Sequence, residues 1–310
     1  MSQKLIQILG TSSQVPTRTR NQGGYFLRWE NQGFLFDPGE GTQQRLIHNG
    51  VPASSITKIF ITHFHGDHCL GLAGILQRIS LDHVSHEIEV YFPQYGMTYF
   101  HNLKNAAIYH DQSNIKAKPF SAGGIIFENE NMIISALELD HTVETWGYRI
   151  QEIDSRTLLP NKLQAAGIEG RRVKQLLEKG SITINDEIIK LEDVSRIKKG
   201  QSFAFVLDTR KCENAVQLAK DVDMFVCEST YLSDNENLAY QYGHLTAAEA
   251  AQIASDANAG TLVLTHYSQR YTSIAPFFEE ASRFHTDVIA ANDGDLIEFP
   301  ANPRDLNTRI

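Results

Sequence analysis

Paired cysteines, long apolar runs and repeated segments are all missing from this chain of 310 residues. Its three cysteines, Cys69, Cys212 and Cys227, form no CxxC pair and no even set, which excludes a disulfide framework and a cysteine-rich metal site. No apolar run approaches the ~20 residues of a membrane span, and residues 1–6 lead into a strand without signal-peptide architecture. We therefore expect a cytoplasmic protein with free, buried thiols and no membrane partner.

Positive charge is also scarce, except in one segment. The formal net charge is −9, which by itself argues against a nucleic-acid ligand. Residues 155–200, however, hold ten Lys and Arg against six Asp and Glu, a local balance of +4. Such a patch can bind phosphates despite the overall sign, but a solvated surface helix has the same composition. Charge alone leaves both interpretations open.

A dense group of metal-ligand side chains stands between a predicted strand and a predicted helix. The apolar run 56–61 reads as a buried strand, and the run 70–76 as a helix. Between them, Thr62-His63-Phe64-His65-Gly66-Asp67-His68 offers three imidazoles and one carboxylate. Nitrogen and oxygen ligands of this kind suit zinc first, and they also accept manganese or iron. A turn that is His-rich by chance is far less common than a metal site with this density of ligands.

Three further candidate ligands follow strand-like runs. His141 follows the alternating run 133–140, Asp208 follows the apolar run 203–207, and His266 follows the apolar run 261–265. Each alone is more often a satisfied polar residue than a ligand. Because sites in layered α/β proteins collect where strands end, we expect all three beside the His-rich motif.

Strand-like and helix-like segments alternate in both halves of the chain. This pattern predicts an α/β protein with two sheets covered outside by helices, a four-layer αββα sandwich built as a single domain over residues 1–310. Strand signals become sparse between residues 151 and 200. There, residues 163–179 read as a helix–turn–helix piece with Gly167 and Gly170 at the break.

These motifs resemble the metallo-β-lactamase superfamily and, within it, the ribonuclease Z family, whose members trim the 3′ ends of tRNA precursors. The resemblance rests on His-x-His-x-Asp-His followed by a distant His, an Asp and a last His. It is extended by the blocks 9–13, 16–21, 36–43 and 264–271, and it runs from about residue 5 to residue 299. It implies the metallo-β-lactamase sandwich, two zinc ions per subunit, precursor tRNA as partner, and a homodimer.

The resemblance also implies roles for individual residues. His63, His65 and His141 would hold one metal. Asp67, His68 and His266 would hold a second, and the carboxylate of Asp208 would bridge the two. Asp67 would also orient or deprotonate the attacking water. The stretch Gly243-His244-Leu245-Thr246 matches a family block, so we interpret His244 as the general acid, with Glu228 fixing its tautomer and raising its pKa. A histidine at a helix start is otherwise a capping or surface residue.

The remaining expectations concern contacts to the substrate. By family analogy Asp37 orients a ligand histidine, Arg270 contacts a phosphate, and the loop 16–21 lies beside the acceptor end of the tRNA. The segment 151–200 resembles an inserted arm that grips tRNA, although the usual Gly-Pro turn is absent. The candidate contacts are Arg18, Arg20 and Asn21 in the loop and Arg171, Arg172 and Lys174 in the arm.

Two other functions remain open at this point. A hydrolase of a small-molecule phosphodiester, lactone or sulfate ester could use the same scaffold and metals. A non-catalytic RNA-binding protein with a vestigial site is a third interpretation, against which the complete set of seven ligand residues argues.

Overall fold

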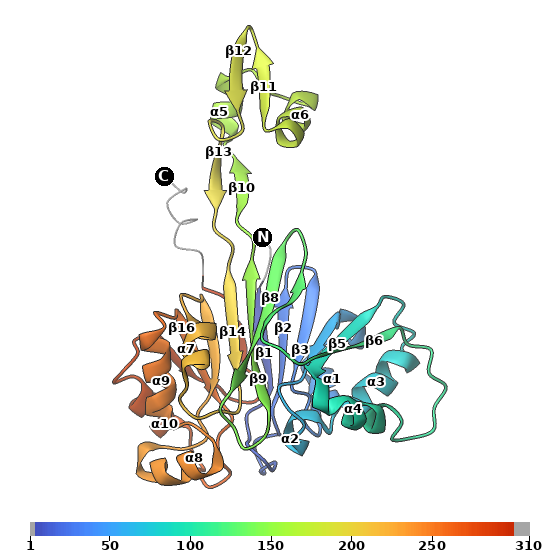
Figure 1. Ribbon diagram of the computed structural model, residues 1–310, viewed down its shortest axis with the longest axis vertical. Coiled ribbons are helices and arrows are strands. Elements are labelled where there is room, and N and C mark those ends of the chain that lie inside the picture. Colours follow the sequence, from blue (N-terminus) through green and yellow to red (C-terminus); the bar gives the residue numbers. More distant parts are fainter. Residues whose placement is uncertain (1–3, 301–310) are drawn as a thin grey trace.

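Mostly apolar runs that are buried on both faces form inner strands of two sheets. Leu5–Gly10 (β1) and Met224–Glu228 (β15) are buried along their whole length, as strands covered on both sides must be. The computed structural model describes residues 4–300, and in Figure 1 its two sheets face each other with helices outside them. This is the predicted αββα sandwich.

Each sheet contains seven strands. The first has the order Leu296–Glu298 (β18), Leu5–Gly10 (β1), Gly24–Trp29 (β2), Gln32–Phe36 (β3), Lys58–Phe60 (β4), Ile88–Pro93 (β5) and Ile115–Phe120 (β6). The second has the order Val288–Ala290 (β17), Thr261–Thr265 (β16), Met224–Glu228 (β15), Ser202–Val206 (β14), Thr145–Glu152 (β9), Met132–Leu139 (β8) and Gly124–Glu128 (β7). In both sheets parallel and antiparallel pairs are mixed, with β3 to β6 parallel and β14 to β17 parallel.

Aromatic side chains fill the space between the sheets. Phe36 stacks on Phe60 of its own sheet at 4.9 Å between ring centroids and meets Phe205 of the opposite sheet at 4.7 Å. Each such pair contributes about 0.5–1.5 kcal/mol beyond the burial of its area. The two sheets are therefore held as one body, and the loops at their ends keep fixed relative positions.

Helices cover the outer face of each sheet. The first sheet packs against Thr42–His48 (α1), Leu72–Leu81 (α3) and Met97–Lys104 (α4), and the second against Glu213–Ala219 (α7), Ala247–Asp256 (α9) and Ala275–Ala281 (α10). Two more helices, Gly66–Cys69 (α2) and Glu236–Tyr242 (α8), and the 3-10 turns Ala53–Ser55 (η1), Gln94–Gly96 (η2) and Ser233–Asn235 (η3) lie in loops. No helix among residues 4–300 has the length and apolarity needed to cross a bilayer. Cys69, Cys212 and Cys227 are free, and Cys212 is only partly buried.

An arm projects from one end of the body. Figure 1 shows it at the top, with the helices Pro160–Ala165 (α5) and Arg171–Lys179 (α6) where the sequence predicts two helices around Gly167 and Gly170. The same figure places α2, and with it Asp67 and His68, at the lower end of the body. The arm and the His-rich motif of one chain therefore lie at opposite ends of the molecule.

The prediction of few strands in residues 151–200 is wrong. Ser155–Leu158 (β10) pairs with Ser195–Lys198 (β13) as a two-stranded neck, and Ser181–Ile184 (β11) pairs with Glu187–Lys190 (β12). Half of the neck residues are exposed and Ser195 alone among them is buried, so the sequence of the neck shows no apolar alternation. The second hairpin turns at Asn185 and Asp186, both with positive φ. This pair is a type I′ turn signal that could have revealed it.

Candidate metal centre

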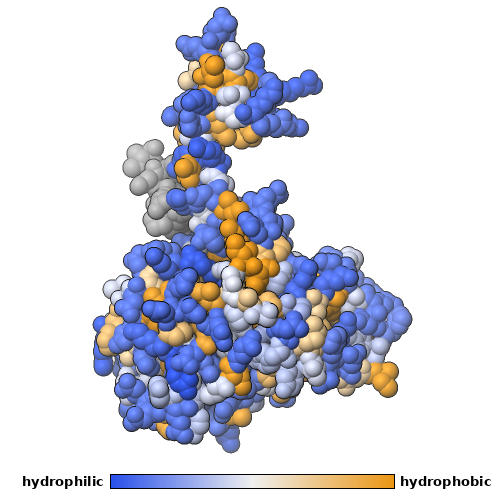
Figure 2. Space-filling view, in the orientation of Figure 1, coloured by the Kyte–Doolittle hydropathy of each residue, from blue (hydrophilic) through white to orange (hydrophobic). Residues whose placement is uncertain are grey.

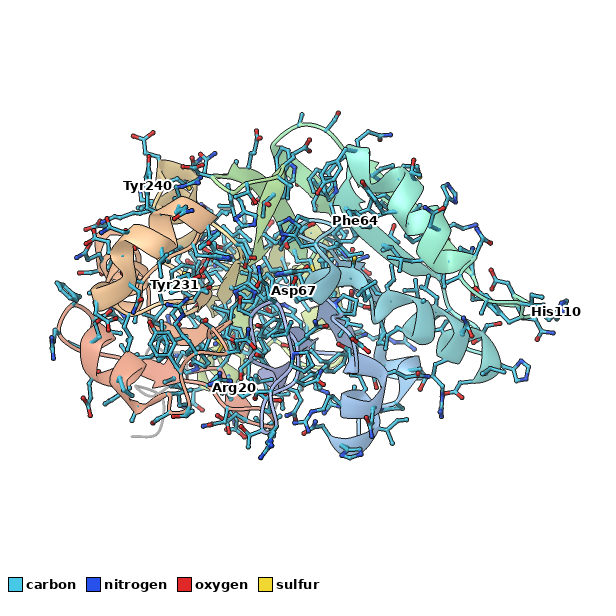
Figure 3. The ribbon with its side chains drawn as sticks, turned by 90° about the horizontal axis from the view of Figure 1, so that it is seen from below. Arg20, Phe64, Asp67, His110, Tyr231 and Tyr240 are labelled. Carbon is cyan, nitrogen blue, oxygen red and sulfur yellow. The ribbon has the colours of Figure 1, made fainter. Side chains whose placement is uncertain are left out.

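All seven predicted ligands gather at one end of the sandwich. His63 and His65 follow β4, Asp67 and His68 lie in α2, and the other three follow β8, β14 and β16. Figure 3 views this end of the molecule and shows Asp67 near its centre. We call the seven residues the metal cluster: His63, His65, Asp67, His68, His141, Asp208 and His266.

Four of these residues form a first group. His65 Nδ1 lies 2.9 Å from His63 Nε2 and 3.4 Å from His141 Nε2. Asp208 Oδ2 lies 3.8 Å from His63 Nε2 and 3.9 Å from His141 Nε2. One ligand atom from each residue can be chosen so that all lie within 4.8 Å of one another. Three imidazoles and one carboxylate suit a tetrahedral zinc site.

A second group lies directly beside the first. Asp67 Oδ2 is 3.4 Å from His68 Nε2 and 3.5 Å from His266 Nε2. Asp208 Oδ2, which belongs to the first group, is also 3.2 Å from His68 Nε2. Asp208 therefore lies between the two groups, where one carboxylate can serve two cations.

Unpartnered buried atoms show that the cluster fits a metal. His68 Nε2, His266 Nε2 and Asp208 Oδ1 are buried and have no hydrogen-bond partner among residues 4–300. Leaving such a group unpaired costs about 1–3 kcal/mol. All three belong to the metal cluster, and a bound cation would satisfy them. The arrangement is that of a metal-binding protein.

Partners outside the cluster fix the orientation of the histidines. Asp37 Oδ2 lies 2.9 Å from His68 Nδ1, and the Asp37 carboxylate accepts hydrogen bonds from the Thr62 amide at 2.8 Å and the Thr62 hydroxyl at 2.7 Å. Thr62 Oγ1 lies 2.9 Å from His63 Nδ1. These contacts occupy Nδ1 of His63 and His68 and turn the Nε2 atom of each ring toward the other members of the cluster, where a cation would bind. The role expected for Asp37 agrees with this geometry.

Replacing Asp37 with Asn should weaken metal binding about 10- to 100-fold, the usual effect of losing such a partner. Asn suits the test because Asp37 has a positive φ of 41°, which Asn tolerates well. Competition with a chromogenic chelator measures the affinity. An affinity equal to that of the unmodified protein would show that Asp37 only supports the fold.

Glu228 and His244 form the predicted pair next to the cluster. Both side chains are buried, and His244 Nδ1 lies 3.1 Å from Glu228 Oε1. Burial alone lowers the pKa of His244, but the carboxylates of Glu228 and Asp208 outweigh it and raise this pKa to about 9. With Nδ1 facing Glu228, Nε2 is the nitrogen left to donate a proton. His244 could also be grouped with Asp208 and His266 as a ligand, which a substitution can test.

The sequence did not identify two partners that position this region. Thr230 Oγ1 donates to Glu228 Oε2 at 2.6 Å and lies 3.0 Å from His266 Nδ1, so it links the acid pair to the cluster. The Gly243 carbonyl lies 2.8 Å from His141 Nδ1 and accepts a hydrogen bond from it. Thr230 stands two residues after Glu228, and this spacing could have indicated that its side chain lies close to the Glu228 carboxylate. A backbone carbonyl leaves no signal in a sequence.

The four substrate residues predicted near the cluster differ in their surroundings. Arg18 and Arg270 are exposed, and Arg270 lies over the Tyr231 ring at 5.1 Å. Arg20 donates to the Ser268 carbonyl at 3.1 Å, and the Asn21 amide donates to the Glu40 carbonyl at 2.9 Å. The last two side chains thus already serve to hold their loop. Contact of these residues with a substrate stays a prediction.

The three predicted arm residues are not part of this site within one chain. Arg171, Arg172 and Lys174 are exposed on α6, at the far end of the molecule from α2 (Figure 1).

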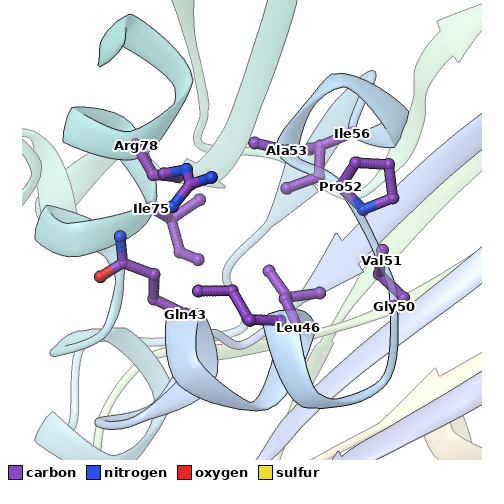
Figure 4. A pocket seen from close by; sticks show the side chains of 10 residues that line it. Gln43, Leu46, Gly50, Val51, Pro52, Ala53, Ile56, Ile75 and Arg78 are labelled. Carbon is purple, nitrogen blue, oxygen red and sulfur yellow. The ribbon is translucent and has the colours of Figure 1, made fainter. Parts of the chain in front are cut away.

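An apolar cavity of about 340 Å³ lies between α1 and α3, with Gln43 and Arg78 on one side (Figure 4). It is separate from the metal cluster, because none of the predicted site residues lines it.

Comparisons with known proteins agree with the site and the fold. A model of the metallo-beta-lactamase superfamily matches residues 24–148, and a model of a beta-lactamase superfamily domain matches residues 194–267. Human tRNase Z, short form, superposes with a TM-score of 0.70 at 24% identity, covering 96% of this chain and 100% of that one. The metallo-beta-lactamase fold protein YhfI from Bacillus subtilis gives 0.69 at 17% identity, covering 96% and 100%. These structures establish the fold.

Closer relatives establish the family. Ribonuclease Z of Chlamydia muridarum (strain MoPn / Nigg) is 45% identical over 302 residues, which are 97% of this chain and 99% of the relative. Ribonuclease Z of Nocardia farcinica (strain IFM 10152) is 46% identical over 306 residues, or 98% and 100%. Since the similarity spans both chains from end to end, this protein belongs to the ribonuclease Z family of the metallo-β-lactamase superfamily.

Proposed function

We propose that this protein is a metal-dependent endoribonuclease that removes the 3′ trailer from tRNA precursors by hydrolysing one phosphodiester bond. The observation that carries this proposal is the metal cluster at one end of the sandwich, in a chain that is similar along its whole length to ribonuclease Z. A cytoplasmic location follows from the substrate.

Two zinc ions are the proposed cofactors, with manganese or iron as substitutes of similar ligand preference. His63, His65 and His141 would hold the first ion, Asp67, His68 and His266 the second, and Asp208 both. When bound, such a pair supplies a hydroxide nucleophile at neutral pH and offsets the charge of the phosphate.

Asp67 and His244 would handle the protons. The Asp67 carboxylate accepts a hydrogen bond from the Gln14 amide at 2.7 Å. Burial raises its pKa, but His68 and His266 outweigh that effect and hold the pKa below its usual range, so the side chain stays ionised and can orient the attacking water through a hydrogen bond. His244 would protonate the leaving 3′ oxygen through Nε2, and Glu228 would stabilise its charged form.

The arm indicates how a large substrate would be held. Because the arm and the metal cluster lie at opposite ends of one chain (Figure 1), the arm can hardly grip a tRNA that its own cluster cleaves. We therefore propose a homodimer in which residues 151–200 of one subunit hold the tRNA that the other subunit cuts. Arg171, Arg172 and Lys174 would contact its phosphates.

Replacing Arg171, Arg172 and Lys174 together with Ala should lower kcat/KM for precursor tRNA on the order of 100-fold and flatten its salt dependence. All three are exposed, whereas the small core of the arm consists of Ile168, Leu176, Ile182 and Val194. The substitutions therefore leave the arm folded, which deletion of residues 163–179 would not. Steady-state cleavage at several salt concentrations measures the effect.

Hydrolysis of bis(p-nitrophenyl) phosphate provides the internal comparison. The small ester needs only the metal cluster, so the triple variant should hydrolyse it at the normal rate. Equal loss on both substrates would show that the arm supports folding, and no loss on either would show a solvated surface. A protein that hydrolyses the small ester but no precursor tRNA would support the alternative, a small-molecule hydrolase.

A further inference from the structure

Three aromatic side chains form a partly exposed surface beside the metal cluster. Phe64 stands between the ligands His63 and His65 in the motif. The Phe64 amide donates to the Tyr95 hydroxyl at 3.2 Å, and the Tyr99 ring of α4 stacks on Phe64 with 5.7 Å between centroids and 27° between planes. Tyr99 is 52% exposed and Tyr95 37%. We call Phe64, Tyr95 and Tyr99 the aromatic platform.

The platform rests on the core and is held in place. Phe92 meets Phe64 edge-on at 5.8 Å and is itself stacked on Phe100 at 4.9 Å. Gly96 lies so close that a Cβ there would come within 1.9 Å of the Phe64 ring. A ring fixed in this way loses little conformational freedom when it binds a ligand, which favours affinity.

The chemistry of the platform suits a nucleobase. Its three rings carry no charge, whereas the predicted phosphate contacts Arg18 and Arg270 are cationic. Exposed aromatic rings bind single-stranded RNA by stacking on its bases, largely without sequence preference. A neutral surface that adjoins the ligands of the metal cluster is therefore suited to a base next to the cleaved bond.

The position of His244 tells which side of the bond this base occupies. His244 protonates the 3′ oxygen that stays with the tRNA, so the tRNA lies on the His244 side, and the phosphate leaves with the trailer. The Tyr231 ring lies 6.1 Å from the His244 ring, so Tyr231 lies on the side of the tRNA body. In Figure 3, Tyr231 and Phe64 lie on opposite sides of Asp67. The platform is thus on the trailer side.

We propose that the aromatic platform binds a nucleobase of the single-stranded trailer, close to the cleaved bond, with Tyr99 as the exposed stacking ring. This proposal rests on the proposed endonuclease function and adds a binding site for the part of the substrate that is removed. It predicts that the enzyme responds to the presence of trailer bases rather than to their sequence.

The test is a cycle of one substitution and one substrate change. Tyr99→Ala is combined with two precursor tRNAs, one with an ordinary trailer and one with tetrahydrofuran (abasic) residues at the first three trailer positions. On the ordinary substrate, Tyr99→Ala should lower kcat/KM roughly tenfold, and on the abasic substrate by less than about twofold. Tyr99→Trp, which keeps a stacking ring, should restore cleavage of the ordinary substrate.

Matched measurements separate the other outcomes. Phe278→Ala removes a similarly exposed aromatic residue (47%) from α10, on the other sheet, and should affect neither substrate. An equal loss on both substrates, or no loss on the ordinary one, overturns the proposal. A changed mass of Tyr99→Ala in light scattering also overturns it, since the platform would then be an interface between copies. Failure of the unmodified protein to cut the ordinary precursor would instead overturn the proposed function.

Discussion

Asp208→Ala is expected to abolish metal binding and hydrolysis together, lowering the rate by more than roughly 10⁴-fold. Asp208 is buried and lies between the two groups of ligands, 3.2 Å from His68 Nε2 and 3.9 Å from His141 Nε2. Removing its carboxylate would leave both proposed cations short of a ligand and takes negative charge from a site with five histidines. Metal content by mass spectrometry and cleavage of precursor tRNA measure the two effects.

Asp82→Ala is the matched control for this loss. Asp82 forms an exposed ion pair with Arg78 at 2.7 Å on the surface of α3, and such a pair contributes at most about 1 kcal/mol to the free energy of unfolding. This variant should keep both metals and full activity. If Asp208→Ala also retained two metal ions per chain, the bridging role of Asp208 would be wrong.

His244→Ala should have a different signature, with both metals retained and the chemical step slowed by roughly 10²–10⁴-fold, the usual contribution of a general acid. His244 Nδ1 faces the Glu228 carboxylate, which also accepts hydrogen bonds from the backbone amides of Thr209 and Leu245. His244 is thus anchored by a residue outside the metal cluster. Single-turnover cleavage and metal analysis of the same preparation distinguish chemistry from metal loss.

Two results would contradict this role of His244. Loss of metal from His244→Ala would make the residue a ligand, as its proximity to Asp208 and His266 allows. Cleavage at the full rate would show that another group protonates the leaving oxygen. His48→Ala, which removes an exposed histidine from α1, is the control and should change neither quantity.

The clustering of the seven candidate ligands could be predicted from the sequence because several of them follow strongly patterned strands. β14 and β16 are continuous apolar runs that are buried at every residue, so the polar residues that end them, Asp208 and His266, are conspicuous. The His-rich motif supplies four more ligand residues in six positions, and β8 leads to His141. Side-chain contacts such as that between Glu228 and His244 could be expected only through the family resemblance.

The elements that the sequence did not reveal are short or exposed segments. β17 and β18 have three residues each, too few to show a period of two. The neck of the arm has little burial and hence little apolar pattern, although it sets the distance between the helices of the arm and the body. The platform was missed because Phe64 is read within a metal motif, while Tyr95 and Tyr99 come from a separate segment after β5.

The proposed endonuclease function is tested most sharply by mapping the products that the metal-loaded protein forms from a precursor tRNA. We predict one cut after the tRNA body, giving a tRNA with a 3′ hydroxyl and a trailer with a 5′ phosphate, because His244 would protonate the 3′ oxygen and the phosphate leaves with the trailer. Gel mapping with enzymatic end analysis identifies both ends. A 3′ phosphate on the tRNA would rule out the proposed role of His244, and an intact precursor beside active hydrolysis of bis(p-nitrophenyl) phosphate would rule out the proposed endonuclease.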